Sequence, residues 1–423
     1  TPIVSNSWGN RRYGQYTLAA REIDDFAWRH RDFLPLYAAG NSGRSGGATI
    51  TPPGTAKNAL TVGAVQGTYR GFELGLPLYA ELLKDQVLAQ FCGKSNTLSD
   101  TAEICTALTG EANCALSDAV SSEGMCDKIK NTKDCCNHPM MKRFCCTKFM
   151  LEKLKKNPHW FNQRNVAVFS SRGPTKDHRL KPELLAHGQP VFGARSYGTT
   201  GPHCPIPLVM QGTSQAAPVM AAFATMTRQY YKKGFYPTGK PNKDHGFNPS
   251  GALLKATLIN SGVNMPGLVD LNGQDQITQL KPIPSFTQGF GRVSLPNTLP
   301  FAGSNFTFFK EEAELSTGES HDFCFTVNSN SDKPFKTTLV WMDYPASPNA
   351  ALTLVNNLDL TVTAASGKLY YGNGGPDHTN NVEQVMIAPS KSAGQTFKIT
   401  VKGSKIPHGP QFYALVVSGQ MNK

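Results

Sequence analysis

No run of about 18 or more apolar residues occurs in this 423-residue chain, so the sequence predicts no transmembrane helix. The opening residues, Thr1 to Trp8, also lack the basic start and apolar centre of a secretory signal. An initiator Met is missing too, and the chain opens within an apolar run typical of a buried strand. We therefore expect the natural amino terminus to lie upstream. At this length and with 39% hydrophobic residues, the chain can form two or three domains, each with its own core.

A concentrated basic patch is missing as well. Lys and Arg outnumber Asp and Glu by 42 to 30, which gives a net charge of +12, but the excess is dispersed along the sequence. The densest group, between Lys148 and Lys156, has few aromatic residues that could stack on bases. The pattern therefore favours a solvated face, and we predict no nucleic-acid partner.

The cysteines lack the usual C-x2-C spacing of a zinc site. A zinc site would have to combine the adjacent cysteine pairs Cys135-Cys136 and Cys145-Cys146 with His138. A dense cluster with an even number of cysteines is instead typical of disulfides, and we favour that interpretation. Disulfides predict a secreted protein or one in the lumen of a secretory or digestive vesicle, where the sequon Asn305-Phe306-Thr307 could be glycosylated. Of the ten cysteines, eight lie in one segment: Cys92, Cys105, Cys114, Cys126, Cys135, Cys136, Cys145 and Cys146.

Strand and helix patterns alternate in residues 1–65 and return in residues 165–300. This alternation predicts an α/β fold, with a parallel sheet and helices on both of its faces. Residues 66–164 carry the cysteine cluster without sheet periodicity, so we expect them to form an inserted, disulfide-stapled subdomain. Strands are expected at 33–40, 59–65 and 165–169, and helices at 17–30, 215–231 and 250–260.

The pattern changes to a period of two in residues 301–423. Short turns separate the expected strands, which predicts a third, all-β domain of the sandwich or jelly-roll type. The strands are expected at 323–327, 336–341, 359–363, 382–387, 396–401 and 412–417.

One serine lies where a glycine-containing loop meets a helix of small residues. In Gly212-Thr213-Ser214, the Ser214 hydroxyl would stand at the first turn of that helix. Free N–H groups and the positive end of the helix dipole favour a developing oxyanion there. An ordinary helix-capping serine would give the same short pattern, so this motif alone does not decide between the two interpretations.

A second motif is an apolar strand that ends in Gly40-Asn41. The Asn41 amide can donate to an oxyanion, and Gly40 permits a substrate to approach closely. Taken alone, a Gly-Asn turn that closes a strand is the simpler interpretation. The order in which these motifs occur along the chain changes this balance.

Five motifs follow one another as they do in the subtilisin family, and the chain closely resembles that family over nearly all of residues 1–300 outside the insertion. The resemblance implies that Ser214 is the nucleophile of a serine endopeptidase and that Asn41 holds the oxyanion. It also implies protein or peptide substrates, and a P1 pocket lined by Ser7, Trp8, Gly9, Ala38, Ala39 and Gly40. The motifs are Ser5-Asn6-Ser7-Trp8-Gly9, Ala38-Ala39-Gly40-Asn41-Ser42-Gly43, Phe169-Ser170-Ser171-Arg172-Gly173-Pro174, Lys181-Pro182-Glu183-Leu184-Leu185 and Gln211-Gly212-Thr213-Ser214.

The family's catalytic Asp and His motifs, which would precede Ser5, are not in this sequence. None of the ten histidines has a His-Gly-Thr context, and His187 is expected in a loop. Asp24 and Asp25 lie on an amphipathic helix and are expected to face solvent. The alternative function is therefore an inactive homologue that binds peptides or acts as an interaction protein. No pattern predicts the oligomeric state.

Three motifs mark the C-terminal region: Leu339-Val340-Trp341-Met342-Asp343-Tyr344-Pro345, Val355-Asn356-Asn357-Leu358-Asp359-Leu360 and Asn380-Asn381-Val382-Glu383. With them, the region resembles the β-sandwich that follows the catalytic domain in some alkaline subtilases and, more distantly, the P domain of proprotein convertases. The resemblance implies no cofactor for the chemistry but allows a structural calcium ion. Asp343, Asp359 and Glu383 offer the oxygen donors that calcium prefers. Scattered acidic residues are more often only solvated.

Overall fold

The computed structural model describes residues 2–68, 70–72, 163–194, 207–269, 277–301 and 306–421. Nearly all of the predicted insertion at 66–164, with its eight clustered cysteines, lies outside these ranges. Among the described residues, no helix is long and apolar enough to cross a membrane.

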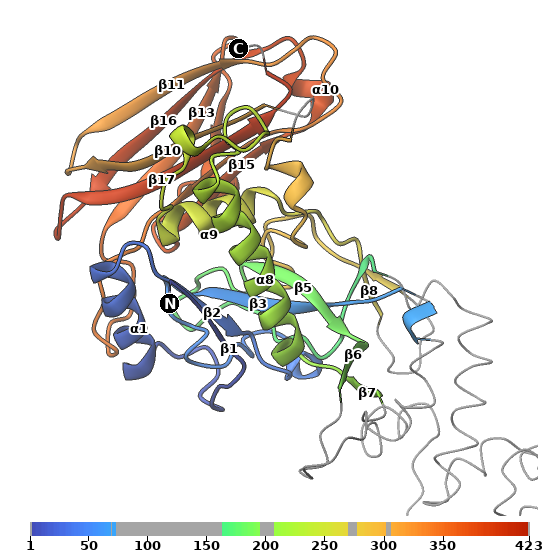
Figure 1. The fold of residues 1–423 in the computed structure, drawn as a ribbon. Coiled ribbons are helices and arrows are strands. Elements are labelled where there is room, and N and C mark those ends of the chain that lie inside the picture. Colours follow the sequence, from blue (N-terminus) through green and yellow to red (C-terminus); the bar gives the residue numbers. More distant parts are fainter. Residues whose placement is uncertain are drawn as a thin grey trace, which may run out of the picture.

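A mostly parallel sheet forms the first part of the fold (Figure 1). Strand β3 pairs in parallel with both β2 and β5, and β2 pairs in parallel with β1. The pairings of β3 with β4 and of β8 with β9 are antiparallel. The strand order in the described residues is β1 (Ile3–Asn6), β2 (Leu34–Ala38), β3 (Leu60–Gln66), β4 (Asn165–Val166), β8 (Gly267–Val269) and β9 (Ile277–Gln279), with β5 (Leu184–Gln189) beside β3. A separate hairpin joins β6 (Val191–Ala194) to β7 (Pro207–Met210).

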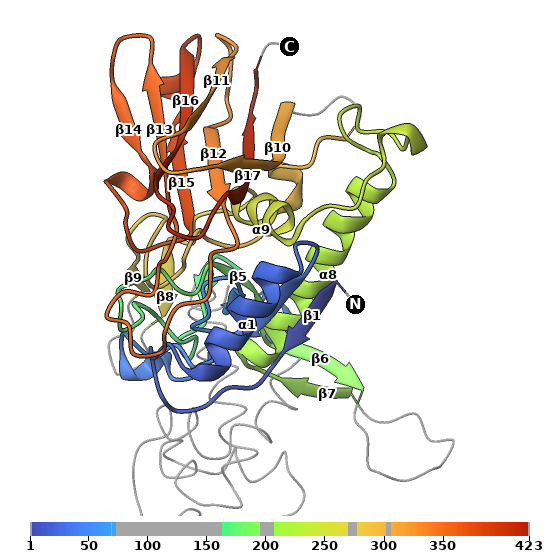
Figure 2. The ribbon, with the colours of Figure 1, turned by 90° about the vertical axis from the view of Figure 1, so that its left-hand side faces the viewer.

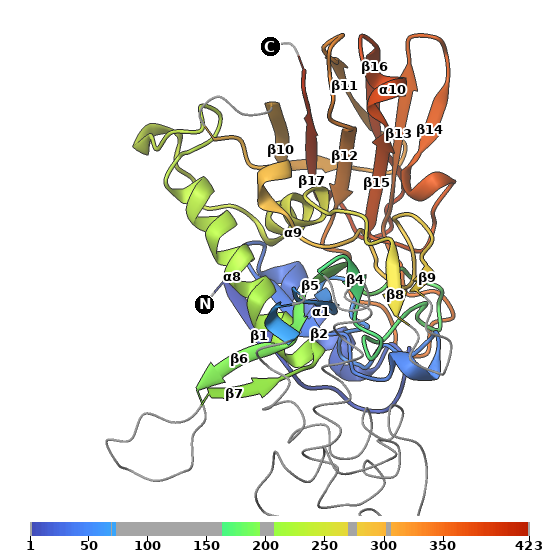
Figure 3. The ribbon, with the colours of Figure 1, turned by 90° about the vertical axis from the view of Figure 1, so that its right-hand side faces the viewer.

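Three longer helices accompany the sheet. Helix α1 (Leu18–Arg29) begins at Thr17, whose side chain accepts from the Ala20 amide, and α9 (Gly251–Asn260) begins in the same way at Ser250. Helix α8 (Thr213–Lys232) contacts β1, β2, β3 and β5. All of α9 is buried, because it lies between the parallel sheet and the C-terminal domain, as all three views show (Figures 1, 2 and 3).

Two antiparallel sheets form the sandwich-like C-terminal domain (Figure 2). Their facing sides enclose a core that includes Trp341, Phe335 and Phe397. The α/β fold followed by an all-β domain is therefore confirmed. One sheet is β10 (Phe306–Leu315), β17 (Gln411–Gly419), β12 (Phe335–Val340) and β15 (Val382–Ile387); the other is β11 (Ser320–Thr326), β16 (Thr396–Lys405), β13 (Asn357–Ala364) and β14 (Leu369–Tyr371). Short helical turns lie at Gly43–Ser45, Lys243–His245, Leu295–Asn297, Gly372–Gly374 and Pro389–Ser392.

Buried charges join the two parts of the fold. The Lys57 ammonium donates to Asp343 Oδ2 at 2.6 Å and to the Thr353 carbonyl at 2.7 Å, and the side chains of Lys57 and Asp343 are both fully buried. Next to this pair, Glu183 accepts from Lys255 at 3.0 Å and also from Lys181. Because such charges are costly to bury without partners, this polar interface holds the β-sandwich in one position on the α/β part.

The expected exposure of Asp24 was wrong. Its side chain is fully buried and accepts from the Tyr16 hydroxyl at 2.8 Å and from the backbone amides of Lys57 and Asn58 at 3.2 and 2.9 Å. Asp25, the next residue, pairs with Arg29 on the outer side of α1. Asp24 is buried because the loop that precedes β3 folds over this face of α1 and supplies the donors that the carboxylate needs.

A buried lysine at the same interface should make stability depend on pH. Lys336 donates to the carbonyls of Asn260 and Gly262 at 2.9 and 2.8 Å, and burial lowers its pKa to about 8. The unfolded chain keeps this proton up to a pH of about 10.4, so between these values the unfolded state binds more protons than the folded state. The contribution of Lys336 to the free energy of unfolding should therefore rise by about 1–3 kcal/mol as the pH rises through this window.

Urea unfolding of the wild type and of Lys336→Met, at pH 7 to 10, checks this expectation. The difference in unfolding free energy between the two proteins should change with pH in favour of the wild type. Titration of other groups cancels in that difference. A difference that stays constant from pH 7 to 10 would contradict the lowered pKa of Lys336.

Candidate active site

Ser214 lies in the first turn of α8, because the helix begins at Thr213 rather than at the predicted Gln215. Gly212 occupies the N-cap position with a φ of 152°. A residue with a side chain would rarely adopt this conformation and would fill the space beside the helix start. No acidic residue lies in the first turn, so the positive end of the helix dipole beside Ser214 is not compensated there. The Ser214 side chain is half-buried.

Thr213 fixes the orientation of Asn41. Its backbone N–H and its hydroxyl both donate to Asn41 Oδ1 at 2.9 Å, and the same hydroxyl accepts from the Gly40 amide at 3.1 Å. Because the amide oxygen of Asn41 takes both bonds, its NH2 group is left to donate elsewhere. The sequence analysis did not identify this role of Thr213.

Two hydrogen-bond donors lie near each other beside Gly212. A Cβ atom placed on Gly212 would lie 3.4 Å from Asn41 Nδ2, 3.5 Å from the Ser214 backbone nitrogen and 2.7 Å from Gln215 Oε1. Within the described ranges, neither of these donors has a hydrogen-bond partner, whereas the neighbouring amides of Thr213 and Gln215 donate to Asn41 and to the Gly212 carbonyl. This pair of convergent N–H donors beside the Ser214 hydroxyl can stabilise an oxyanion.

Ser7 contacts both the backbone and the hydroxyl of Ser214. Pro218 has no N–H to donate to the Ser214 carbonyl four residues before it, so the helix leaves this carbonyl without its usual bond. The Ser7 hydroxyl donates to this carbonyl at 2.8 Å, and the Ser214 hydroxyl lies 3.4 Å from the Ser7 carbonyl. The end of β1 is thereby attached to the start of α8, next to the candidate nucleophile.

We expect Ser7→Ala to lower the reactivity of Ser214 about three- to tenfold, the value of one hydrogen bond. The measurement is the rate constant for labelling of Ser214 by a fluorophosphonate, in a form of the protein that reacts with this probe. In a Pro218→Ala background the helix can supply its own N–H to the Ser214 carbonyl, so Ser7→Ala should then change the rate less than twofold. Equal losses in both backgrounds would contradict this role of Ser7.

The other predicted substrate-binding residues form two segments that meet at Thr51. Gly9 and Gly40 both pack on Thr51, since an added Cβ would lie 2.6 Å from Thr51 Oγ1 in the first case and 2.7 Å from Thr51 Cγ2 in the second. Thr51 also donates to the Ala39 carbonyl from its amide and its hydroxyl. Trp8 is 57% exposed, and its ring contacts Tyr37 edge to face at 5.8 Å. Thr51 carried no signal in the sequence, because its place depends on the approach of two distant segments.

The described histidines do not contact the Ser214 hydroxyl through hydrogen bonds, and within these residues its hydrogen-bond partner is the Ser7 carbonyl. His187 lies in strand β5 rather than in the expected loop, because it continues the pairing with β3, and its ring contacts the Pro190 carbonyl at 2.7 Å. His30 stacks on Phe26 at the exposed end of α1.

The three candidate calcium donors have different surroundings. Asp343 accepts from Lys57, Val355 and Asn356, which occupy both of its oxygens. Asp359 accepts from Asn357 and Ser404. Glu383 is buried and accepts from the Leu360 amide through Oε2, but its Oε1 has no hydrogen-bond partner among the described residues. Burial, reinforced by nearby Asp377 and Asp359, raises the pKa of Glu383 well above its usual value.

Comparison with known families decides the identity of the fold that carries this site. The model of the subtilase family, Peptidase S8, matches residues 1–291. The chain belongs to the subtilase family. Membership establishes homology to serine peptidases.

Curated relatives of this subtilase come from Dictyostelium discoideum. The serine protease/ABC transporter B family protein tagD is 30% identical over 477 residues, and the match covers 99% of this chain and 25% of tagD. The protein of the same description named tagA is 29% identical over 451 residues, which cover 98% of this chain and 24% of tagA. The subtilase chain therefore spans about a quarter of the length of these relatives.

Proposed function

We propose that this subtilase is a serine endopeptidase that cleaves peptide bonds through an acyl-enzyme on Ser214. The convergence of the Asn41 side-chain amide and the Ser214 backbone amide beside the hydroxyl supports this assignment most directly. Attack of Ser214 Oγ on a carbonyl carbon forms a tetrahedral oxyanion, which these two N–H groups would stabilise. Collapse of this intermediate breaks the C–N bond and releases the amine, and water later hydrolyses the acyl-enzyme.

The proton of the Ser214 hydroxyl must pass to a base and then to the leaving amine. Because the described residues bring no histidine to this hydroxyl, we infer that the active enzyme receives its His and Asp from a segment outside them. Without these partners, only the oxyanion donors and substrate binding would accelerate the reaction, by roughly 10³–10⁴-fold over water.

Labelling with a fluorophosphonate tests this function. Two forms are compared: the 423-residue chain and one extended upstream to the start of the natural protein, each with and without Ser214→Ala. We expect the extended form alone to be labelled, and Ser214→Ala to abolish this labelling. If the extended form folds but is not labelled, the protein is the alternative, an inactive homologue that binds peptides.

We also propose that the protein works in an oxidising compartment, either secreted or in the lumen of a secretory or digestive vesicle. The dense cysteine segment between Cys92 and Cys146 supports this. Alkylation of the purified native protein without reductant should modify Cys324, which is exposed and free, but none of the eight clustered cysteines. Alkylation of most of these eight would contradict the proposal.

A structural calcium ion is a further proposal, and the unpartnered Oε1 of buried Glu383 supports it. In the part of the chain that the structure describes, no three His, Cys, Asp or Glu side chains are grouped to hold a metal. Glu383 would therefore have to share the ion with amide or backbone oxygens, as calcium allows. Calcium should raise the melting temperature of the wild type but not that of Glu383→Gln. An equal rise in both proteins would refute the site.

A further inference from the structure

A cavity of about 440 Å³ lies where the α/β part meets the β-sandwich. Residues from the end of α1, from the start of α9 and from strands β10 and β17 line it, and none of them belongs to the site around Ser214. Its volume lies within the range of small-molecule sites, roughly 300–1,000 Å³. The cavity exists only because the two domains are held together, so a ligand there would contact both of them.

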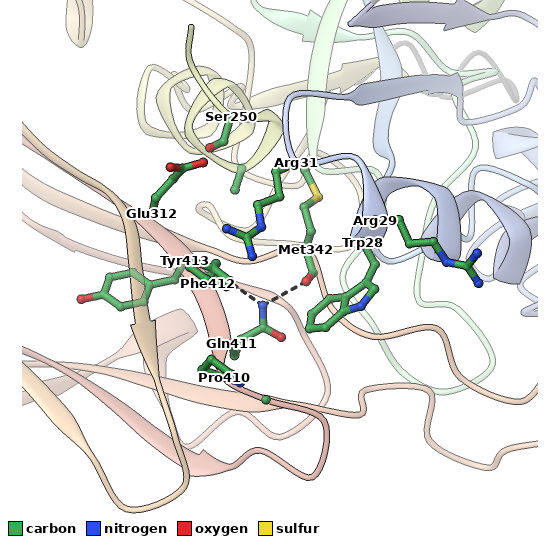
Figure 4. Close-up of a pocket in the computed structure, with 12 residues that line it drawn as sticks. Trp28, Arg29, Arg31, Ser250, Glu312, Met342, Pro410, Gln411, Phe412 and Tyr413 are labelled. Atoms are coloured by element: carbon green, nitrogen blue, oxygen red, sulfur yellow. Dashed lines mark hydrogen bonds between the residues drawn. The ribbon is translucent and has the colours of Figure 1, made fainter. Parts of the chain in front are cut away.

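Arg31 supplies a positive charge to this cavity. Its guanidinium lies over the Phe412 ring, with Cζ 3.3 Å from the ring centroid. Within the described ranges no carboxylate pairs with it. Arg29, which also lines the cavity, instead pairs with Asp25 at 2.9 Å and points away in Figure 4.

Glu312 supplies a negative charge from the opposite domain. It lies in a bulge of β10, where the register with β17 shifts between Lys310 and Ala313. Its φ of 52° is unusual for a residue other than glycine, and such bulges redirect side chains at sites. Among the described residues Glu312 forms no ion pair, and Figure 4 shows its carboxylate on the same side of the cavity as Ser250.

The rest of the lining is mainly apolar. Trp28, Met342 and Pro410 present their side chains to the space, and the Gln411 amide is occupied by the carbonyls of Met342 and Phe412 at 3.0 and 2.8 Å (Figure 4). The cavity therefore combines one available cation, one available anion and an apolar wall. Both charged residues are exposed to solvent, and only a molecule with two opposite charges could pair with both of them.

We propose that this cavity binds a small zwitterion with an apolar side chain, that is, an amino acid or dipeptide with an aromatic or large aliphatic group. Its carboxylate would take the two parallel N–H donors of Arg31, and its ammonium would bind Glu312. The side chain would pack on Trp28 and Met342. This binding does not depend on the peptidase activity of Ser214.

Calorimetry with the full Ser214→Ala chain tests the proposal, because this variant cannot consume the ligand. The probes are L-phenylalanine and the dipeptide Gly-Phe, at concentrations up to about 10 mM, the range for weak charge pairs. N-acetyl-L-phenylalanine lacks the ammonium, and L-phenylalanine amide lacks the carboxylate. We expect at least one zwitterion to bind about tenfold or more tightly than its matching single-charge analogues.

Variants assign the two charges. Arg31→Gln should weaken binding of the zwitterion about tenfold or more and remove its advantage over the amide, while Glu312→Gln should remove its advantage over the acetylated analogue. Arg29→Gln is the matched control and should change the affinity less than twofold. The proposal is overturned if neither zwitterion binds, if the analogues bind equally well, or if Arg29→Gln and Arg31→Gln have equal effects.

Discussion

Asp343→Asn should destabilise the protein by about 3–5 kcal/mol, because it leaves the Lys57 ammonium buried without an opposite charge. Asp343 is fully buried, and its two oxygens accept from Lys57 and from the amides of Val355 and Asn356. Burial raises the pKa of Asp343 even though Lys57 acts to lower it. Pairing with Lys57 therefore offsets only part of the free energy needed to bury the Asp343 carboxylate. Loss of one partner leaves the other charge buried without any offset.

The measurement is urea unfolding at neutral pH, combined with a double-mutant cycle through Lys57→Met. Each single variant should be severely destabilised, and the double variant should lose less than the sum of the two. Asp322→Asn is the matched control, since Asp322 pairs with Lys398 at 3.4 Å but both side chains are half-exposed. It should change the stability by less than about 1 kcal/mol. Similar losses for Asp343→Asn and Asp322→Asn would contradict the importance of the buried pair.

Much of the fold follows from local sequence. Helices α1 and α9 match their predicted ranges within one residue at each end, because Thr17 and Ser250 are strong N-caps. Strand β15 has the predicted bounds, since Asn380-Asn381 precedes it and Pro389, which cannot donate to a ladder, follows it closely. Strand β10 was missed, since its bulge near Glu312 interrupts the period of two on which the prediction depends.

The candidate site was predicted by motif order rather than by geometry. The structure brings Ser7 next to Ser214, and Gly40 and Asn41 next to Thr213. Thr213 and the buried Asp24 could not be assigned in this way, because Asn41, which binds Thr213, and the Lys57 and Asn58 amides, which bind Asp24, lie more than 30 residues away in the sequence. Helical periodicity gives the face on which a residue such as Asp24 lies, but it does not show which loop covers that face.

Asn41→Leu should lower kcat about 10²–10³-fold with little change in KM, in the form of the protein that reacts with fluorophosphonate. This is the loss measured for removal of the oxyanion-hole Asn in a subtilisin, equivalent to about 2.7–4 kcal/mol of transition-state stabilisation. The expectation applies because Asn41 Nδ2 and the Ser214 amide lie near the same position beside Gly212, and Asn41 Nδ2 has no other partner among the described residues. A donor that acts only on the developing oxyanion changes kcat rather than substrate binding.

Variants of Thr213 distinguish the role of the Asn41 amide as a donor from the role of Thr213 in orienting that amide. Thr213→Val removes the hydroxyl that donates to Asn41 Oδ1 and accepts from the Gly40 amide, but it keeps the backbone N–H bond to Asn41, so kcat should fall about tenfold. Thr213→Ser keeps both bonds and should retain most of the activity. In the Asn41→Leu background, Thr213→Val should have little further effect, because the amide that it orients is gone. Additive losses would show that Thr213 acts independently of Asn41, and an unchanged kcat in Asn41→Leu would remove Asn41 from the oxyanion site.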